Sequence, residues 1–151
     1  MLIKLNDGTN LDINNILIDF EGVVSVTGSV PYGVKEGIQE LQSKGIQITL
    51  IVDQLSEVLI NLSKLLGVNI ESPQSDADYK IIARNVDLSK TAYLGCRKSK
   101  YILYRQCALK VAVLQAEGLA VSILPTSDIL VKHINDAIDL LIYSERIQNL
   151  L

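Results

Sequence analysis

The segment Asn-Ile-Leu-Ile-Asp-Phe-Glu-Gly-Val-Val at residues 15–24 constrains the fold more than any other part of this chain. Three branched apolar residues run without interruption up to Asp19, and the chain then turns at Gly22. Such a run is typical of a strand buried on both faces, as in a parallel sheet. Open α/β sheets bind ligands just beyond the carboxyl ends of their strands, where Asp19 would lie. Asp19 is therefore the first candidate for a nucleophilic carboxylate, and Glu21 is a second acid beside it.

Length and composition narrow the classes of protein to which the chain can belong. It has 151 residues, enough to bury a core, so one domain spanning residues 1–151 is expected. Apolar residues make up 48% of the chain, which indicates a globular protein. The net charge of −3 argues against a dedicated nucleic-acid binder, so no nucleic-acid partner is expected.

Targeting signals and cysteines set further expectations. The chain has no apolar run of about 18 residues, so no membrane span is expected. The N-terminus lacks the basic and apolar pattern of a secretory signal, which makes the cytoplasm the expected location. Cys96 and Cys107 are too few for a zinc site and should be free thiols in a reducing compartment. Cations beside Cys96 could lower the pKa of its thiol and make it reactive.

Apolar periodicity predicts alternating strands and helices behind a small N-terminal hairpin around Asp7-Gly8, with hairpin strands at 2–5 and 11–13. This alternation favours an α/β fold, a three-layer Rossmann-like sandwich around a mainly parallel sheet. Residues 24–32 are too few to form a separate cap domain. Strands are expected at 15–19, 46–52, 68–70, 91–94, 111–114 and 128–131, and helices at 33–45, 54–66, 76–86, 97–107, 119–124 and 134–151, the last broken near Tyr143.

Four segments carry a resemblance to a known family. They are Ile-Asp-Phe-Glu-Gly-Val at 18–23, Pro-Tyr-Gly-Val-Lys-Glu at 31–36, Leu-Ile-Val-Asp at 50–53 and Thr-Ala-Tyr-Leu-Gly at 91–95. Over nearly its whole length the chain resembles the haloacid dehalogenase (HAD) superfamily. More narrowly, it looks like the soluble P-type ATPase-like branch of that superfamily. The resemblance implies a HAD-like core that is essentially without a cap.

The same resemblance implies a phosphohydrolase mechanism and assigns roles to residues of this chain. Asp19 matches the nucleophile that forms an aspartyl-phosphate, and Glu21 is the candidate general acid/base. Gly22 and Lys80 match positions that hold the phosphate. Ser99 and Lys100 join this candidate phosphate site because the basic segment 97–100 could bind an anion.

Two departures from the family pattern fall on its chemistry. Ile51 stands where a Ser or Thr hydroxyl normally holds the phosphate. The loop at 95–100 normally supplies acids to Mg²⁺, but here it has no carboxylate, and Lys100 stands in its place. A lysine within about 4 Å of Mg²⁺ would be repelled by roughly 8 kcal/mol at an effective dielectric constant near 20, as an upper bound. No metal site and no cofactor are therefore expected, and Mg²⁺ would bind only if the family site survives through Asp19.

Other interpretations of the same residues stay open. Asp19 could be a strand-end carboxylate bonded to backbone N–H groups or to Lys100. Asp53 is most simply a helix N-cap. Lys80 could be a solvated residue on an amphipathic helix, and segment 97–100 a solvated basic turn.

Three functions follow from these observations, and whether the chain is an enzyme is left open. The first is a catalytically degenerate HAD-like protein that binds a small anion or a protein partner. The second is an active phosphatase that hydrolyses small phosphate esters or acyl phosphates through Asp19. The third is a structural role as a homo-oligomer that uses the apolar C-terminal residues 138–151.

Overall fold

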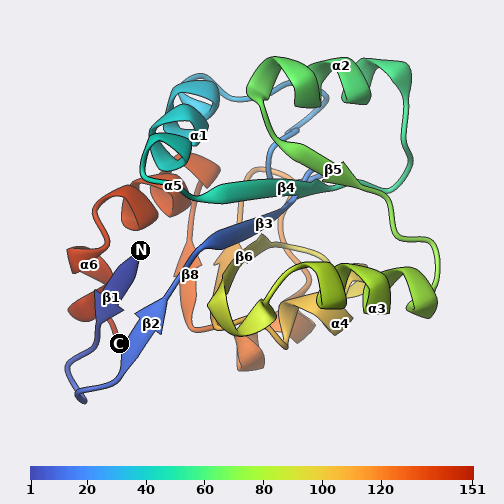
Figure 1. Ribbon diagram of the computed structural model, residues 1–151. Helices are drawn as coiled ribbons and strands as arrows, with labels where there is room; N and C mark the ends of the chain where they lie inside the picture. The colour runs from blue at the N-terminus through green and yellow to red at the C-terminus, as the bar shows by residue number, and fades with distance from the viewer.

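Six parallel strands form the central sheet of the protein, which the computed structural model describes over all residues 1–151 (Figure 1). Their order across the sheet is β5-β4-β3-β6-β7-β8, and every neighbouring pair is parallel. The buried apolar runs predict this arrangement. The strands are β3 (Asn15–Asp19), β4 (Gln47–Ile51), β5 (Asn69–Glu71), β6 (Thr91–Gly95), β7 (Leu109–Val113) and β8 (Ile129–Val131).

Helices cover both faces of this sheet and complete three layers (Figure 1). One face carries α1 (Val34–Ser43), α2 (Glu57–Leu66) and α5 (Ile134–Ile142), and the other carries α3 (Asp76–Asn85) and α4 (Tyr101–Tyr104). The expected three-layer α/β sandwich is confirmed, and no cap domain is inserted after β3. None of the helices combines the length and apolar character that a membrane span requires.

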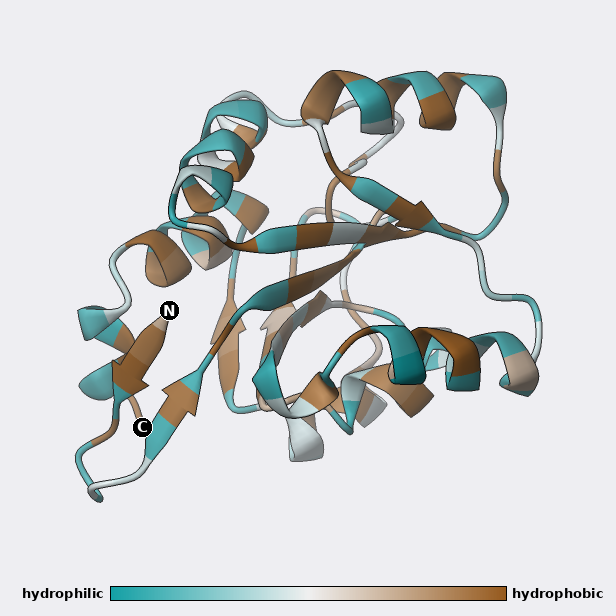
Figure 2. Cartoon of the chain, in the orientation of Figure 1, coloured by the Kyte–Doolittle hydropathy of each residue, from teal (hydrophilic) through white to brown (hydrophobic).

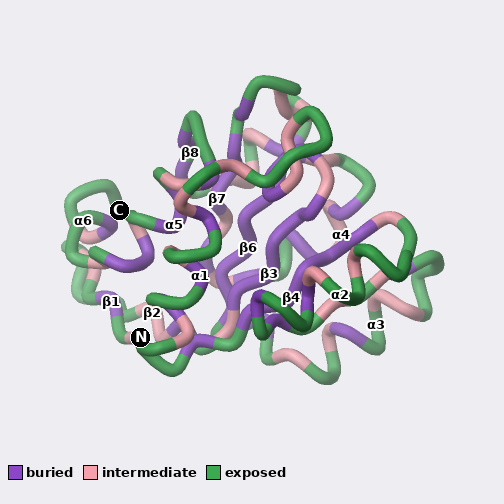
Figure 3. The backbone as a smooth tube through the Cα atoms, turned by 90° about the horizontal axis from the view of Figure 1, so that it is seen from above, coloured by how far each residue is buried: buried purple, intermediate pink, exposed green.

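The protein has two hydrophobic cores, one on each face of the sheet, because side chains alternate between the two faces along each strand. Ile16 and Ile18 of β3 belong to the larger core, under α1 and α5, whereas Leu17 belongs to the smaller core, under α3 and α4. The strands are mostly apolar and the helices are apolar on one side only (Figure 2). Seen from above, the buried residues concentrate in the central strands (Figure 3). Asp19 shares the face of Leu17 and so ends a strand inside the smaller core.

The order of the strands reverses between β3 and β6. From β3 the chain adds β4 and β5 on one side, then returns to place β6 on the other side of β3. The carboxyl ends of two such strands diverge into connections that leave in opposite directions, which is where open α/β sheets place their ligands. Asp19 at the end of β3 and Cys96 just after β6 therefore lie at the position that the topology favours for a site.

The N-terminal hairpin forms as expected and packs at the C-terminal end of the chain (Figure 1). β1 (Leu2–Lys4) pairs antiparallel with β2 (Asn10–Asp12) in a separate sheet. The Asn6 side chain donates a hydrogen bond of 2.7 Å to the carbonyl of Gln148 in α6 (Glu145–Gln148). The predicted break near Tyr143 is confirmed, because α5 ends at Ile142.

Three local predictions are wrong. Asp53 does not cap α2, because Ser56 accepts a hydrogen bond of 3.2 Å from the Leu59 N–H and is the N-cap. The predicted helix at 97–107 is reduced to a 3₁₀ turn at Lys98–Lys100 and the single turn of α4. The predicted helix at 119–124 is a 3₁₀ helix, Val121–Thr126, with Pro125 inside it. Proline lacks the N–H that an α-helix would need there.

Replacing Gly37 by alanine is expected to destabilise the protein, although alanine normally favours a helix. A Cβ at this position would lie 2.5 Å from Ile138 Cγ2 in the contact between α1 and α5. Overpacking of this kind costs about 1–3 kcal/mol, more than the roughly 1 kcal/mol that alanine gains by helix propensity. Urea denaturation of Gly37→Ala measures the effect. In an Ile138→Ala background the same change should stabilise, and an equal loss in both backgrounds would contradict the steric account.

Candidate functional site at the carboxyl edge of the sheet

Asp19 is a buried carboxylate with both oxygens hydrogen-bonded. Its residue is only 1% exposed. The Tyr93 hydroxyl donates a bond of 2.7 Å to Oδ1, and the backbone N–H of Cys96 donates one of 3.1 Å to Oδ2. Both donors come from β6 and the residue after it, so the neighbouring strand holds the carboxylate in place.

Burial changes the pKa values of Asp19 and Tyr93. It raises the pKa of Asp19 from its ordinary value of 3.8 to about 6, against the opposing effects of the Tyr93 hydroxyl, the Cys96 amide and the charges of Lys100 and Arg97. Burial and the nearby Asp19 charge also raise the pKa of Tyr93 well above its usual range. Tyr93 therefore stays protonated and remains a donor, whereas Asp19 changes charge in weakly acidic solution.

A second carboxylate, Asp53, lies between two cations at the same edge. Lys100 Nζ is 3.1 Å from Asp53 Oδ1, and the Arg97 guanidinium donates to Asp53 Oδ2. We call these three residues the Asp53 cluster. Lys100 is 4% exposed. Partial burial tends to raise the pKa of Asp53, but the hydrogen bonds and charges of Arg97 and Lys100 outweigh it, so the pKa lies below its usual value.

Hydrogen bonds with neighbouring side chains hold both the N–H and the carbonyl group of Asp53. Its N–H donates a bond of 3.2 Å to Glu21 Oε1. Its carbonyl accepts bonds from the Ser72 hydroxyl at 3.0 Å and from the Gln74 amide at 2.7 Å. Glu21 thus anchors the end of β4 through its side chain, a role that its position beside Asp19 did not suggest.

An open pocket of about 460 Å³ lies beside these carboxylates. Gly22 forms one wall with a φ of +81°, and a Cβ there would meet Cys96 Sγ at 2.9 Å. The segment Arg97, Lys98 and Ser99 forms another wall, and the lining includes one acid, Glu117, whose Oε2 lies 3.6 Å from the Cβ position of Gly22. A pocket bordered by a basic segment and a close-approaching glycine suits a small anion.

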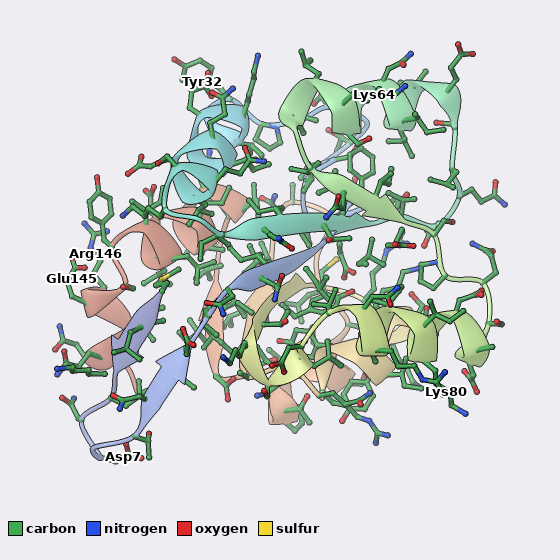
Figure 4. All side chains as sticks on the ribbon, viewed as in Figure 1. Asp7, Tyr32, Lys64, Lys80, Glu145 and Arg146 are labelled. Atoms are coloured by element: carbon green, nitrogen blue, oxygen red, sulfur yellow. The ribbon has the colours of Figure 1, made fainter.

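The structure brings together most of the predicted site residues. Asp19, Glu21, Gly22, Ser99 and Lys100 all lie at the carboxyl edge of the sheet. Lys80 does not join them: it is exposed on the outer side of α3 and points away from the sheet (Figure 4). Lys100 contacts Asp53 rather than Asp19, so the possible ion pair between Lys100 and Asp19 is not formed.

The donor set at this edge does not fit a magnesium ion of the family type. Mg²⁺ prefers oxygen ligands in an octahedron, usually with one or two free carboxylates. Both Asp19 oxygens accept hydrogen bonds, and both oxygens of Asp53 contact cations. Nowhere does a group of three His, Cys, Asp or Glu side chains stand ready to hold a metal. The neighbouring strand end offers Ile51 and Val52, which bring no hydroxyl.

The surroundings of Cys96 do not favour the reactive thiol that the neighbouring cations could produce. Burial, reinforced by the charge of Asp19, raises the pKa of its thiol to about 12, and Arg97 offsets this only in part. Burial likewise raises the pKa of Cys107 to about 12. Neither cysteine is a thiolate near neutral pH, and thiols in this state are poor nucleophiles.

Sequence reasoning missed Tyr93 and the contact between Arg97 and Asp53. Tyr93 is paired in register with Leu17, so its side chain runs along the face on which Asp19 lies. A tyrosine within an otherwise aliphatic buried strand is a signal that its hydroxyl needs a partner. The contact between Arg97 and Asp53 joins residues 44 apart in sequence, and no local pattern indicates it.

The raised pKa of Asp19 predicts how stability depends on pH. Between pH 4 and 6 the folded protein keeps the Asp19 proton that the unfolded chain has released. The contribution of Asp19 to the free energy of unfolding should therefore be highest below pH 4 and fall by about 3 kcal/mol as pH rises through 6. Urea denaturation across this range, compared with Asp19→Asn, isolates the effect. In Tyr93→Phe, which removes a donor to the ionised form, the fall should extend above pH 6. A pH-independent difference between wild type and Asp19→Asn would contradict this account.

Comparison with known proteins finds similarity in structure alone. No protein-family model and no curated protein matches the chain. The 3-deoxy-D-manno-octulosonate 8-phosphate phosphatase of Yersinia pestis superposes with a TM-score of 0.74 at 18% identity, over 99% of this chain and 95% of that one.

Two further solved structures have a similar fold. The 3-deoxy-D-manno-octulosonate 8-phosphate phosphatase of Moraxella catarrhalis, in complex with magnesium, phosphate and KDO, gives a TM-score of 0.72 at 18% identity, covering 91% of this chain and 90% of that one. A protein of Legionella pneumophila assigned to the HAD superfamily (subfamily III A) gives 0.71 at 20% identity, covering 91% and 86%. The narrower resemblance to the soluble P-type ATPase-like branch stays a prediction. The fold of this chain is the fold of HAD superfamily hydrolases.

Proposed function

We propose that the protein binds a small phosphate-bearing anion at the carboxyl edge of its sheet and does not catalyse magnesium-dependent hydrolysis. The observation that carries this proposal is the Asp53 cluster. Arg97 and Lys100 place two positive charges at the strand ends where the HAD resemblance expects acids and a metal ion. A pair of cations attracts the same phosphate oxygens that a metal would otherwise neutralise.

The surroundings of the cluster support an anionic ligand. The adjoining pocket is bordered by Arg97, Lys98 and Ser99 and by the backbone of Gly22, with Glu117 as the one acid in its lining. Lys98 is exposed and makes no ion pair within the chain, so its charge is free to attract an anion. Guanidinium and ammonium groups are the usual protein partners of phosphate.

The state of Asp19 argues against hydrolysis of the family type. A nucleophilic carboxylate needs a free oxygen in line with the phosphorus, and both Asp19 oxygens accept hydrogen bonds in a 1% exposed residue. Its attack on a phosphate would also need a counter-charge, which a metal ion supplies in metal-assisted transfer. The residues at this edge do not fit that ion.

An active phosphatase is the second candidate, and the similar structures favour it more directly than they favour loss of activity. Those from Yersinia pestis and Moraxella catarrhalis are phosphatases of a sugar phosphate, and the second contains magnesium and phosphate. In this candidate, Asp19 is the nucleophile toward small phosphate esters or acyl phosphates. Glu21 is the acid/base, and Lys100 takes over part of the charge of the metal.

Partners and location are further proposals. A protein partner or a homo-oligomer would use surfaces other than the C-terminal stretch as a whole, because Ile138, Leu141 and Ile147 are buried within the chain. The exposed large hydrophobic side chains there are Tyr143, Leu150 and Leu151. A cytoplasmic location without nucleic-acid partners remains the prediction of the sequence.

Metal dependence separates the two candidate functions. We expect purified protein to hydrolyse p-nitrophenyl phosphate and acetyl phosphate no faster than Asp19→Asn, with or without Mg²⁺. We also expect calorimetry in EDTA to detect binding of inorganic phosphate, weakened at least roughly tenfold, about 1.4 kcal/mol, in Lys100→Met because one of two cations is lost.

Lys80→Ala is the matched control, since it removes an exposed lysine that lies away from the site. Its phosphate affinity should equal that of the wild type. Magnesium-dependent turnover that Asp19→Asn abolishes would establish the phosphatase instead. Turnover without metal that Lys100→Met abolishes would show that lysine replaces the metal charge in catalysis.

A further inference from the structure

The Asp53 cluster has the composition of an occupied anion site. One carboxylate contacts two cationic side chains from the loop after β6, with Lys100 Nζ at 3.1 Å and the Arg97 guanidinium in a hydrogen bond. Two cations around one anion is also the arrangement in which proteins hold a bound phosphate. The carboxylate of Asp53 therefore stands where a ligand anion would stand.

The side chains of Asp53 and Lys100 differ in how freely they can move. Side-chain exposure is 45% for Asp53 but 5% for Lys100. The backbone of Asp53 is fixed by Glu21, Ser72 and Gln74. The carboxylate can thus rotate into water while its backbone stays in place. Lys100 has no such freedom, and a buried ammonium left without an anion is strongly destabilising. Asp53 can therefore leave only if another anion replaces it.

The charge balance of the site points the same way. With all groups ionised, three cations, Arg97, Lys98 and Lys100, face four carboxylates, Asp19, Glu21, Asp53 and Glu117, so the site as a whole carries one net negative charge. A site of this charge repels a further anion. With Asp53 turned into solvent, the remaining charges balance, and an anion can approach Arg97 and Lys100.

We propose that Asp53 is an internal anion that holds Arg97 and Lys100 until a phosphate dianion displaces it. This inference rests on the proposed function and names the ligand class, phosphate dianions rather than carboxylates. An incoming monoanion only reproduces the contacts that Asp53 already makes and pays the entropy of association in addition. A dianion with three oxygens contacts both cations at once and carries the extra charge that drives the exchange. Asp53 thus competes with incoming anions, and monoanions bind too weakly to displace it.

Calorimetry with inorganic phosphate and with acetate at pH 8 in EDTA tests this exchange. Wild type should bind phosphate and show no measurable binding of acetate. In Asp53→Asn the competing charge is gone, so phosphate should bind at least roughly tenfold tighter and acetate binding should become measurable. Asp128→Asn is the matched control: it breaks the ion pair of Asp128 with Lys110 (2.9 Å) at β7 and should leave phosphate affinity unchanged.

The outcomes distinguish failure of this inference from failure of the proposed function. Equal phosphate affinity in wild type and Asp53→Asn, weakened by adding Lys100→Met, would keep the anion site and overturn the role of Asp53. No phosphate binding by any folded variant would overturn both. Phosphate affinity that is the same in Asp53→Asn and in Asp53→Asn/Lys100→Met would place the ligand elsewhere and also overturn both.

A measurement on the wild type covers the case in which Asp53→Asn fails to fold. Carboxyl ¹³C NMR follows the Asp53 resonance during a phosphate titration. Displacement predicts a shift of that resonance that tracks saturation, while Asp12, which pairs with Lys90 at 3.4 Å, stays unchanged. An Asp53 resonance that does not move at phosphate saturation would overturn the proposal.

Discussion

A buried ammonium group must have an anion beside it, and the pairing of Lys100 with Asp53 meets this requirement. The pairing also links the ends of two strands of the sheet. Asp53 follows β4 and Lys100 follows β6, and these strands flank β3 on its two sides. Together with Arg97, the ion pair therefore connects the two loops on either side of the end of β3. The 1% exposure of Asp19, which ends β3, is consistent with this closure.

The carboxylate beneath this closure is held by polar groups rather than by a counter-ion in contact. Tyr93 and the Cys96 amide each donate one hydrogen bond to it, while Lys100 and Arg97 act only through their charge at longer range. Hydrogen bonds to the ionised form and desolvation oppose each other, and desolvation prevails. The HAD resemblance predicts a metal ion that neutralises charge at this position. We propose that side chains from β6 and its loop take this role in this chain, and this is the physical basis for proposing anion binding without metal-dependent hydrolysis.

The periodicity of apolar residues, together with the rule that open α/β sheets bind ligands at the carboxyl ends of their strands, predicts much of this arrangement. Apolar runs such as residues 15–19 predict parallel buried strands, and parallel strands with helical crossovers leave few topologies. The placement of Asp19, Gly22 and Lys100 at one edge follows from that topology alone. Lys80 shows the limit of the approach. Its helix was predicted, but Ile82 fixes which face of α3 is buried, and Lys80 falls on the solvent side.

Side-chain partners across the sheet were the part that sequence reasoning could not supply. Asp53 precedes a predicted helix, which favours a capping role, yet Ser56 three residues later is the cap. The carboxylate of Asp53 is then free to meet Arg97 and Lys100, whose approach depends on how the loop after β6 folds. Tyr93 lies within the segment 91–95 that carries part of the family resemblance, but its bond to Asp19 depends on the register of β3 with β6. Such contacts are set by tertiary packing rather than by local pattern.

Paramagnetic NMR with Mn²⁺, which takes the oxygen ligands that Mg²⁺ takes, tests most directly whether cations have replaced the metal at this edge. The account predicts that millimolar Mn²⁺ leaves the amide signals of Gly22, Gly95 and Cys96 no more broadened than those of surface residues. Selective broadening of these three signals that disappears in Asp19→Asn would show a divalent ion bound by Asp19 and would contradict the account.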